Sequence, residues 1–184
     1  MIQLPDRGRR GDPFTDPAPS IAEHLPGRDL SQTELAALAR AIAGEPALWN
    51  GHVCHDGERR HYRQLYRDGH VDAWVLCWSN AQDTGFHDHD GSAGAVFVCS
   101  GSLIEDRYEL RGRTIRRASV VRAAGGGFDF PGSHVHSVRH PGGAEPAVSI
   151  HVYSPPIARM GYYDVGDDGL LRRTSLDHTE DVAA

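Results

Sequence analysis

The sequence predicts a mostly β protein, a sandwich or small barrel with one helix near its N-terminal end. From about Arg59 onward, short runs rich in β-branched and aromatic residues recur between glycine and proline turns, a spacing typical of all-β domains. Strands do not alternate with helical segments as in a parallel α/β fold. One amphipathic stretch precedes the strand-rich part, and it accounts for the predicted helix.

Composition limits the classes of function. A chain of 184 residues, 39% of them hydrophobic, suits a single globular domain with a real core. The formal charge of −6 argues against binding to nucleic acid or to an anionic membrane surface. No apolar run is long enough to span a bilayer, and the N-terminus lacks the apolar core of a signal peptide. We therefore expect no nucleic acid or membrane partner, and a monomer.

The three cysteines, Cys54, Cys77 and Cys99, are odd in number and form no CxxC pair. This spacing argues against a structural zinc ribbon and favours reduced thiols in a cytoplasmic protein. Histidine is the unusual residue, with 12 copies, most of them in three stretches, 52–70, 87–89 and 134–151.

The chain divides into three parts. Residues 1–28 carry many prolines and charges and predict an extended leader that partly packs on the domain. Residues 29–165 predict a single domain that includes the N-terminal helix. Residues 166–184 predict a charged C-terminal tail that frays.

The expected helix covers residues 32–43. It starts at a capping box formed by Ser31 and Glu34, carries apolar residues at Leu35, Leu38 and Ile42, and stops at Gly44. The following "PALWN" predicts a short helical turn. The expected strands cover residues 71–78, 93–101, 102–110, 113–122, 134–140 and 147–154, with a short strand after the glycine turn at 125–127.

Two histidines separated by one residue, His87 and His89, raise the question of a metal site. On a strand, residues i and i+2 face the same side, so both rings can point into one barrel mouth while Asp88 faces away. His136 lies in another strand-like segment, in an i, i+2 pair with His134. An isolated HxH is a weak signal, but two close histidines and a distant third on a small barrel favour a divalent metal. Imidazole suits zinc, copper, iron and nickel alike.

A polar row follows on the strand at 147–154. Ser149, His151 and Tyr153 share one face of it, and apolar residues occupy the other face. The polar face either meets solvent or forms a hydrogen-bonded row from hydroxyl to imidazole to phenol. Spacing alone does not decide between these two readings.

Three motifs, "HDHDGSAGAVFVCSG", "HVHSVRH" and "SIHVYSPP", together resemble the cysteine dioxygenases, the thiol dioxygenases of the cupin superfamily, and most closely their bacterial type. The resemblance spans about residues 62–160. It implies an all-β cupin fold, a small β-barrel or jelly roll with short N-terminal helices. It also implies one Fe(II) ion bound by His87, His89 and His136.

The resemblance further implies the reaction and its residues. Such an enzyme adds both atoms of O2 to the sulfur of L-cysteine and yields cysteine sulfinate, so its partners are a small thiol and O2. The row of Ser149, His151 and Tyr153 is then catalytic, and Tyr153 also contacts substrate. The "HYRQL" stretch is similar to the segment with the arginine that holds the substrate carboxylate, which places that role at Arg63.

This sequence departs from the family pattern around the pocket. Gly94 stands where animal members have a cysteine crosslinked to the tyrosine, and where many cupins have a carboxylate ligand. His61 replaces a common tyrosine, His134 a glycine, and His140 an asparagine. A one-residue slip would bring Gln64 to the arginine position, as in the related mercaptopropionate dioxygenases. These departures leave the natural thiol and the roles of His134 and His140 open.

Two alternatives therefore stand beside cysteine oxidation. The first keeps the iron chemistry but changes the substrate to another small carboxylated thiol such as 3-mercaptopropionate. The second is a non-redox metal-binding cupin, either a sensor of a small molecule or an isomerase.

Overall fold

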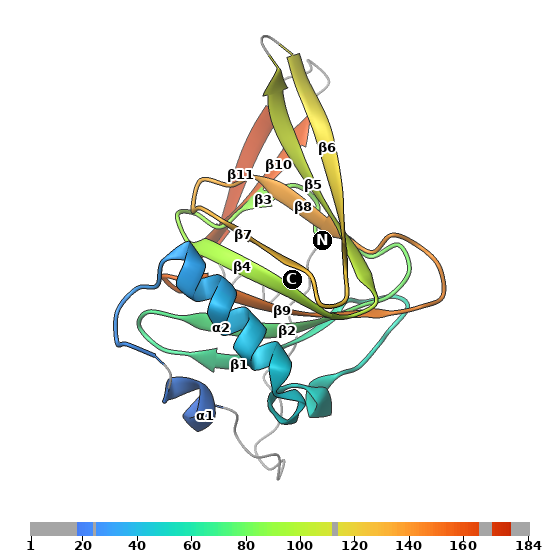
Figure 1. The fold of residues 1–184 in the computed structure, drawn as a ribbon. Coiled ribbons are helices and arrows are strands. Elements are labelled where there is room, and N and C mark those ends of the chain that lie inside the picture. Colours follow the sequence, from blue (N-terminus) through green and yellow to red (C-terminus); the bar gives the residue numbers. More distant parts are fainter. Residues whose placement is uncertain (1–17, 24, 112–113, 166–170, 178–184) are drawn as a thin grey trace.

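Two antiparallel β-sheets face each other, and helices cover the outer face of one of them (Figure 1). This computed structural model describes residues 18–23, 25–111, 114–165 and 171–177. The helices of this part are α1 (Ala18–Ala22), α2 (Gln32–Gly44) and the 3-10 turns η1 (Pro46–Leu48) and η2 (Asn50–His52).

The first sheet has the strand order β1-β2-β9-β4-β7. Its strands are β1 (His61–Arg67), β2 (Asp72–Trp78), β9 (Ala147–Ser154), β4 (Ala93–Ser100) and β7 (Gly127–Phe130). The second sheet has the order β11-β10-β3-β8-β5-β6. Its strands are β11 (Leu171–Asp177), β10 (Arg159–Val165), β3 (His87–Asp88), β8 (His136–Arg139), β5 (Ser102–Arg111) and β6 (Thr114–Ala123). These two sheets confirm the all-β fold class.

Helix α2 lies across β4 and β9 on the outer face of the first sheet (Figure 1). Its start is fixed by the expected capping box, in which the Ser31 hydroxyl accepts from the Glu34 N–H and the Glu34 carboxylate accepts from the Ser31 N–H. Leu35, Leu38 and Ile42 are buried in one apolar cluster with the outward side chains of the sheet. The helix prediction is confirmed to within one residue, and "PALWN" forms the expected helical turn.

Strand β9 runs through the middle of the first sheet, and all eight of its residues are buried. Val148, Ile150 and Val152 point toward the helix and join its apolar cluster. The alternate residues point between the two sheets, because successive side chains of a strand face opposite sides. The polar row on this strand therefore faces the interior of the barrel and not solvent.

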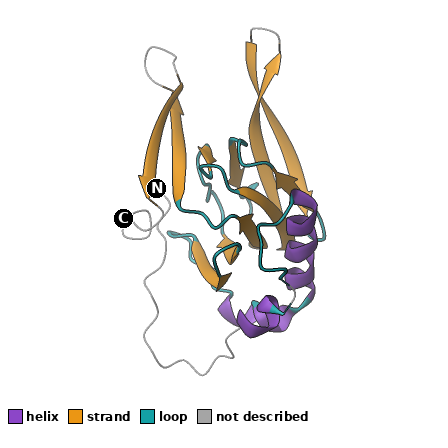
Figure 2. Cartoon of the chain, turned by 90° about the vertical axis from the view of Figure 1, so that its left-hand side faces the viewer, coloured by secondary structure: helices purple, strands orange, loops and turns teal. Residues whose placement is uncertain are grey.

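Some elements were not expected from the sequence. Part of the expected extended leader, residues 18–22, forms helix α1, and its Ile21 is buried against the core. Within the stretch expected to fray, Leu171–Asp177 form β11, which pairs along its whole length with β10. The first seventeen residues, 166–170 and 178–184 lie outside the described part. The hairpins β5–β6 and β10–β11 project from the same end of the molecule (Figure 2).

The three cysteines are free thiols, as expected. Among the described residues, no helix is long and apolar enough to cross a membrane.

Helix α2 stabilises the sheet that carries the polar row, and this contact can be tested by mutation. Leu35 is fully buried, so Leu35→Ala is expected to lower the free energy of unfolding by about 2–5 kcal/mol. Thr33→Ala, at an exposed position of the same helix, is the matched control and is expected to change it by less than about 0.5 kcal/mol. Urea unfolding measures both, and equal values for the two variants would contradict this packing.

Candidate metal centre and substrate pocket

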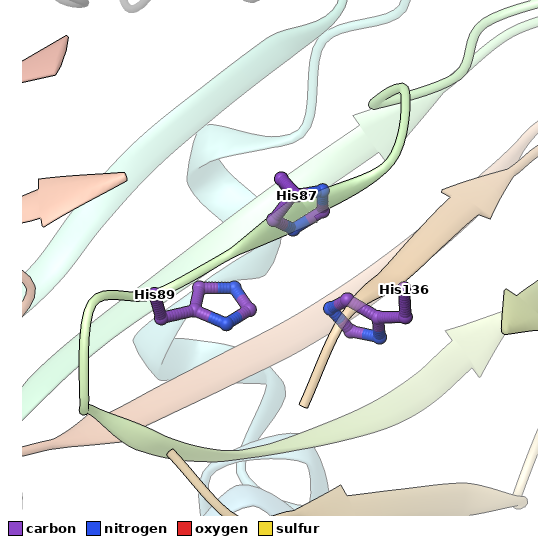
Figure 3. Close-up of side chains that lie close together, drawn as sticks. All are labelled: His87, His89 and His136. Atoms are coloured by element: carbon purple, nitrogen blue, oxygen red, sulfur yellow. The ribbon is translucent and has the colours of Figure 1, made fainter. Parts of the chain in front are cut away.

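Three histidines converge between the two sheets (Figure 3). His87 begins β3, His89 follows it directly, and His136 begins β8. The short strands β3 and β8 are neighbours at the centre of the second sheet, and their register pairs His87 with His136. One candidate ligand nitrogen from each ring lies within 4.8 Å of the other two, and all three residues are buried. The three residues therefore form a candidate site for one metal ion.

The three rings are held in the form that binds a metal. Burial, together with the neighbouring His136, holds the pKa of His87 well below its usual value. Burial also lowers the pKa values of His89 and His136, so the rings are neutral near pH 7. Nδ1 of His87 lies 3.0 Å from the carbonyl oxygen of Gly85. Because a carbonyl only accepts, Nδ1 carries the proton and Nε2 keeps the lone pair for a metal.

Gly94 allows the rings of Phe130 and Tyr153 to pack against the backbone beside the centre. A Cβ atom at this position would lie 2.4 Å from the ring of Phe130 and 2.9 Å from the ring of Tyr153. A carboxylate ligand or a crosslinking cysteine at this position would therefore require its neighbours to move. The donor set around this centre is three neutral imidazoles.

Asp88, between the two histidines of β3, points to the opposite side of the sheet. Its carboxylate accepts from Nε and Nη2 of Arg173, from the hydroxyl of Tyr163 and from the N–H of Asp90. Burial alone would raise the pKa of Asp88, but these hydrogen bonds hold it well below its usual value. Asp88 is thus an anion bound outside the metal centre.

Glu105 of β5 lies behind His136. Its Oε1 accepts from Nε2 of His134 at 3.0 Å and lies 3.6 Å from Nδ1 of His136. Burial alone would raise the pKa of Glu105, but the two imidazoles hold it well below its usual value. His134 thus contacts the centre through Glu105. One possible ligand atom each of Glu105, His134 and His136 also lies within 4.8 Å of the other two. His134 therefore lies next to His136, the third histidine of the candidate centre.

The polar row on β9 is formed as a continuous chain of hydrogen bonds. The indole N–H of Trp78 donates to Oγ of Ser149 at 2.9 Å, and this oxygen lies 2.8 Å from Nε2 of His151. Nδ1 of His151 lies 3.2 Å from the hydroxyl of Tyr153. Burial lowers the pKa of His151 to about 3, so its ring is neutral and donates from only one nitrogen.

The row ends at the histidine cluster. The ring of Tyr153 lies 4.9 Å from the ring of His89, and burial raises the pKa of its hydroxyl. A neutral phenol is a hydrogen-bond donor and acceptor at the edge of the pocket.

A guanidinium completes the pocket, but it belongs to Arg60 and not to Arg63. Strand alternation places Arg60 and Tyr62 on the inner face before β1 bends at a bulge after Gln64. The Arg60 guanidinium lies 4.7 Å from the Trp78 ring, and its Nη1 donates to the carbonyl of Asp83. Burial lowers the pKa of Arg60, and electrostatic interaction with Tyr62, Tyr162 and Tyr153 opposes this shift without cancelling it. Arg63 is exposed, so the structure does not bring it to this site.

Two functional candidates, Arg60 and Glu105, were missed in the sequence. Trp78, expected mainly in core packing, lies in an apolar cluster and also donates to Ser149. Glu105 lies in an alternating strand, and its inward position is the one signal that could have found it. His140, whose role was open, holds a turn: its Nε2 lies 2.8 Å from the carbonyl oxygen of Glu145, and its Nδ1 accepts from the Gly142 N–H.

A buried cluster of three neutral imidazoles between the sheets of a double-sheet β fold defines a metal-dependent cupin. The family profile described as "Cysteine dioxygenase type I" matches residues 14–165. The chain therefore belongs to the cysteine dioxygenase type I family, and it is an oxidoreductase of the thiol dioxygenase class.

Curated relatives agree with this assignment. Cysteine dioxygenase type 1 of Bos taurus is 26% identical over 145 residues, which cover 75% of this chain and 72% of the relative. The Rattus norvegicus enzyme is 26% identical over 151 residues, which cover 78% of this chain and 75% of that enzyme. Among solved structures, a Thermus thermophilus protein aligns with a TM-score of 0.48 at 18% identity, covering 58% of this chain and 92% of that one. An oxalate oxidase in complex with glycolate aligns with a TM-score of 0.47 at 15% identity, and the alignment covers 58% of this chain and 56% of the oxidase.

Removal of one imidazole tests the metal centre. His136→Ala leaves two ligands, so the affinity of the apoprotein for Co(II), a spectroscopic stand-in for Fe(II), is expected to fall by at least about 100-fold. His55→Ala, on an exposed loop, is the control and is expected to bind as the wild type does. Absorption titration of the apoprotein measures both. Equal affinities for His136→Ala and the wild type would place the metal elsewhere.

Proposed function

We propose that this protein is an Fe(II)-dependent dioxygenase that converts L-cysteine to cysteine sulfinate. The observation that carries the proposal is a buried cluster of three imidazoles with two further polar groups near it. The Tyr153 ring lies 4.9 Å from the His89 ring, and the half-buried Arg60 guanidinium interacts electrostatically with Tyr153 and His151. Family membership supplies the reaction class, and these side chains match the groups of an amino-acid thiol.

His87, His89 and His136 would hold the iron, and no carboxylate side chain is present at Gly94. Three neutral ligands leave the full charge of Fe(II) uncompensated, and a nearby divalent charge favours the deprotonated form of a thiol. When bound, ferrous iron supplies the centre at which the thiolate sulfur and dioxygen react. Both oxygen atoms of O2 end on the sulfur of the sulfinate.

Arg60 is the residue that we now propose for the substrate carboxylate, in place of Arg63. A guanidinium binds a carboxylate with two parallel hydrogen bonds. Nε of Arg60 is buried and has no hydrogen-bond partner among the described residues, so part of its donor fork is available. Trp78 supports the guanidinium plane from one side, which limits the orientations in which a carboxylate can approach.

Tyr153 is proposed to donate a hydrogen bond to the bound substrate. The indole of Trp78 can only donate, so it occupies a lone pair of the Ser149 oxygen. With Ser149 donating to Nε2 of His151, the Nδ1–H donates to the oxygen of Tyr153. The phenol proton is then free to point into the pocket.

Outside the site, we propose a cytoplasmic monomer with a small thiol and O2 as its partners. Free thiols at all three cysteines support the cytoplasmic location, and family membership supports the thiol and O2 as partners.

The test of the proposed function is oxygen consumption by protein loaded anaerobically with Fe(II). L-cysteine, 3-mercaptopropionate and cysteamine are supplied in parallel, and products are identified by mass. We expect uptake with L-cysteine, matched by a product that gains two oxygen atoms. A preference for 3-mercaptopropionate would keep the chemistry and change the substrate. Iron binding without uptake for any thiol would favour a non-redox cupin.

Two arginine variants decide which guanidinium holds the carboxylate. Loss of a hydrogen bond to a charged group costs about 1.5–3 kcal/mol, so Arg60→Gln is expected to lower kcat/KM for L-cysteine by about 10–100-fold. Arg63→Gln is the matched control, expected to change it less than about 2-fold. Cysteamine, which has no carboxylate, should lose little activity with either variant. A selective loss with Arg63→Gln would return the role to Arg63.

A further inference from the structure

The outer side of β3 carries a second set of contacts that the reaction does not use. His87 and His89 face the barrel interior, while Asp88 faces the hairpin β10–β11. Nε and Nη2 of Arg173 lie 2.7 and 2.8 Å from the two oxygens of Asp88. This is a bidentate ion pair, the geometry that gives the strongest orientation between these two groups.

Gly161 makes this ion pair possible. It pairs with Asp88 across β3 and β10, so the guanidinium of Arg173 must cross it. A Cβ atom at Gly161 would lie 2.3 Å from Nε and 2.5 Å from Cζ of Arg173. Its backbone φ is not in the left-handed region, so its small size, and not its conformational freedom, is what the contact requires.

The same carboxylate and its neighbour receive further contacts. The Tyr163 hydroxyl donates to Asp88 at 2.6 Å, and Nη2 of Arg173 also donates to Asp90 at 2.9 Å. Strand β3 has only two residues, which pair with β10 and β8. Just before it, the Tyr163 N–H donates to the Phe86 carbonyl and the Thr84 N–H donates to the Val138 carbonyl. The side-chain contacts of Asp88 and Asp90 add to these few backbone bonds in fixing the strand between its neighbours.

We propose that Arg173 is a positioning residue that clamps β3 through Asp88 and so sets the placement of His87 and His89 for the metal. The clamp rests on the proposed metal centre. The family match ends at residue 165. Arg173, the cation of the clamp, comes from strand β11 and therefore lies outside that match. Strand β10 pairs with β3 directly, and strand β11 is joined to β3 by an ion pair that crosses Gly161.

The test uses the full-length apoprotein and two readouts, the affinity for Co(II) and hydrogen–deuterium exchange of the peptide that contains β3. Arg173→Lys keeps the charge but removes the fork, and Gly161→Ala keeps both partners but puts a methyl group in the path of the guanidinium. Arg159→Met is the matched control. It removes an ion pair with Asp177 in the same hairpin that does not contact β3.

We expect Arg173→Lys and Gly161→Ala to weaken Co(II) binding about 10-fold or more and to speed exchange in β3. Arg159→Met should bind Co(II) within about 2-fold of the wild type and leave that exchange unchanged. Wild-type affinity in both clamp variants, even with a lower melting temperature, would overturn the proposal. If the wild type binds no Co(II), the proposed metal centre fails. Exchange in β3 then decides the clamp alone: unchanged protection in the variants would refute it.

Discussion

The pairing of His87 with His136 across two very short strands is the constraint on which the site depends. In a strand the side chains alternate, so a shift of one residue in either β3 or β8 would turn an imidazole away from the interior. Neither strand is long enough to hold its register alone. Contacts from neighbouring strands help to hold them in place. Glu105 of β5 lies 3.6 Å from the ring of His136, and Arg173 of β11 donates to Asp88, which lies between His87 and His89. Asp88 thus holds β3 from its outer side, and Glu105 holds β8 on the inner side through the ring of His136.

The opposite wall of the pocket is built in another way. Strand β9 is long, central and buried on both faces, so its side chains are fixed by packing and by the helix on its outer side. That rigidity allows a row of polar groups to stay in line, from the Trp78 indole to the Tyr153 phenol. The proposed metal ligands and the polar row therefore belong to opposite walls of the barrel, one on each sheet.

Period-two alternation was sufficient to predict much of this arrangement from the sequence. It placed His87 and His89 on one face, and it brought Ser149, His151 and Tyr153 into one row. The role given to Arg63 came instead from the similarity of the "HYRQL" stretch to a family segment. Alternation argues against it, because Arg63 follows the inward-facing Tyr62 directly and is exposed on the opposite face of β1. Strand β11 was missed because its residues are charged and mostly exposed, and pairing with β10 gives no local sequence signal.

Arg60 precedes the first residue of β1, and its position has a consequence for how such an enzyme changes substrate in evolution. The metal ligands are tied to sheet register, so a substitution or insertion near them disturbs the whole barrel. The guanidinium is supplied from the end of a loop, where residues can be exchanged or inserted without breaking the ladder of hydrogen bonds. With the role proposed for Arg60, substrate choice can drift while the three histidines remain unchanged.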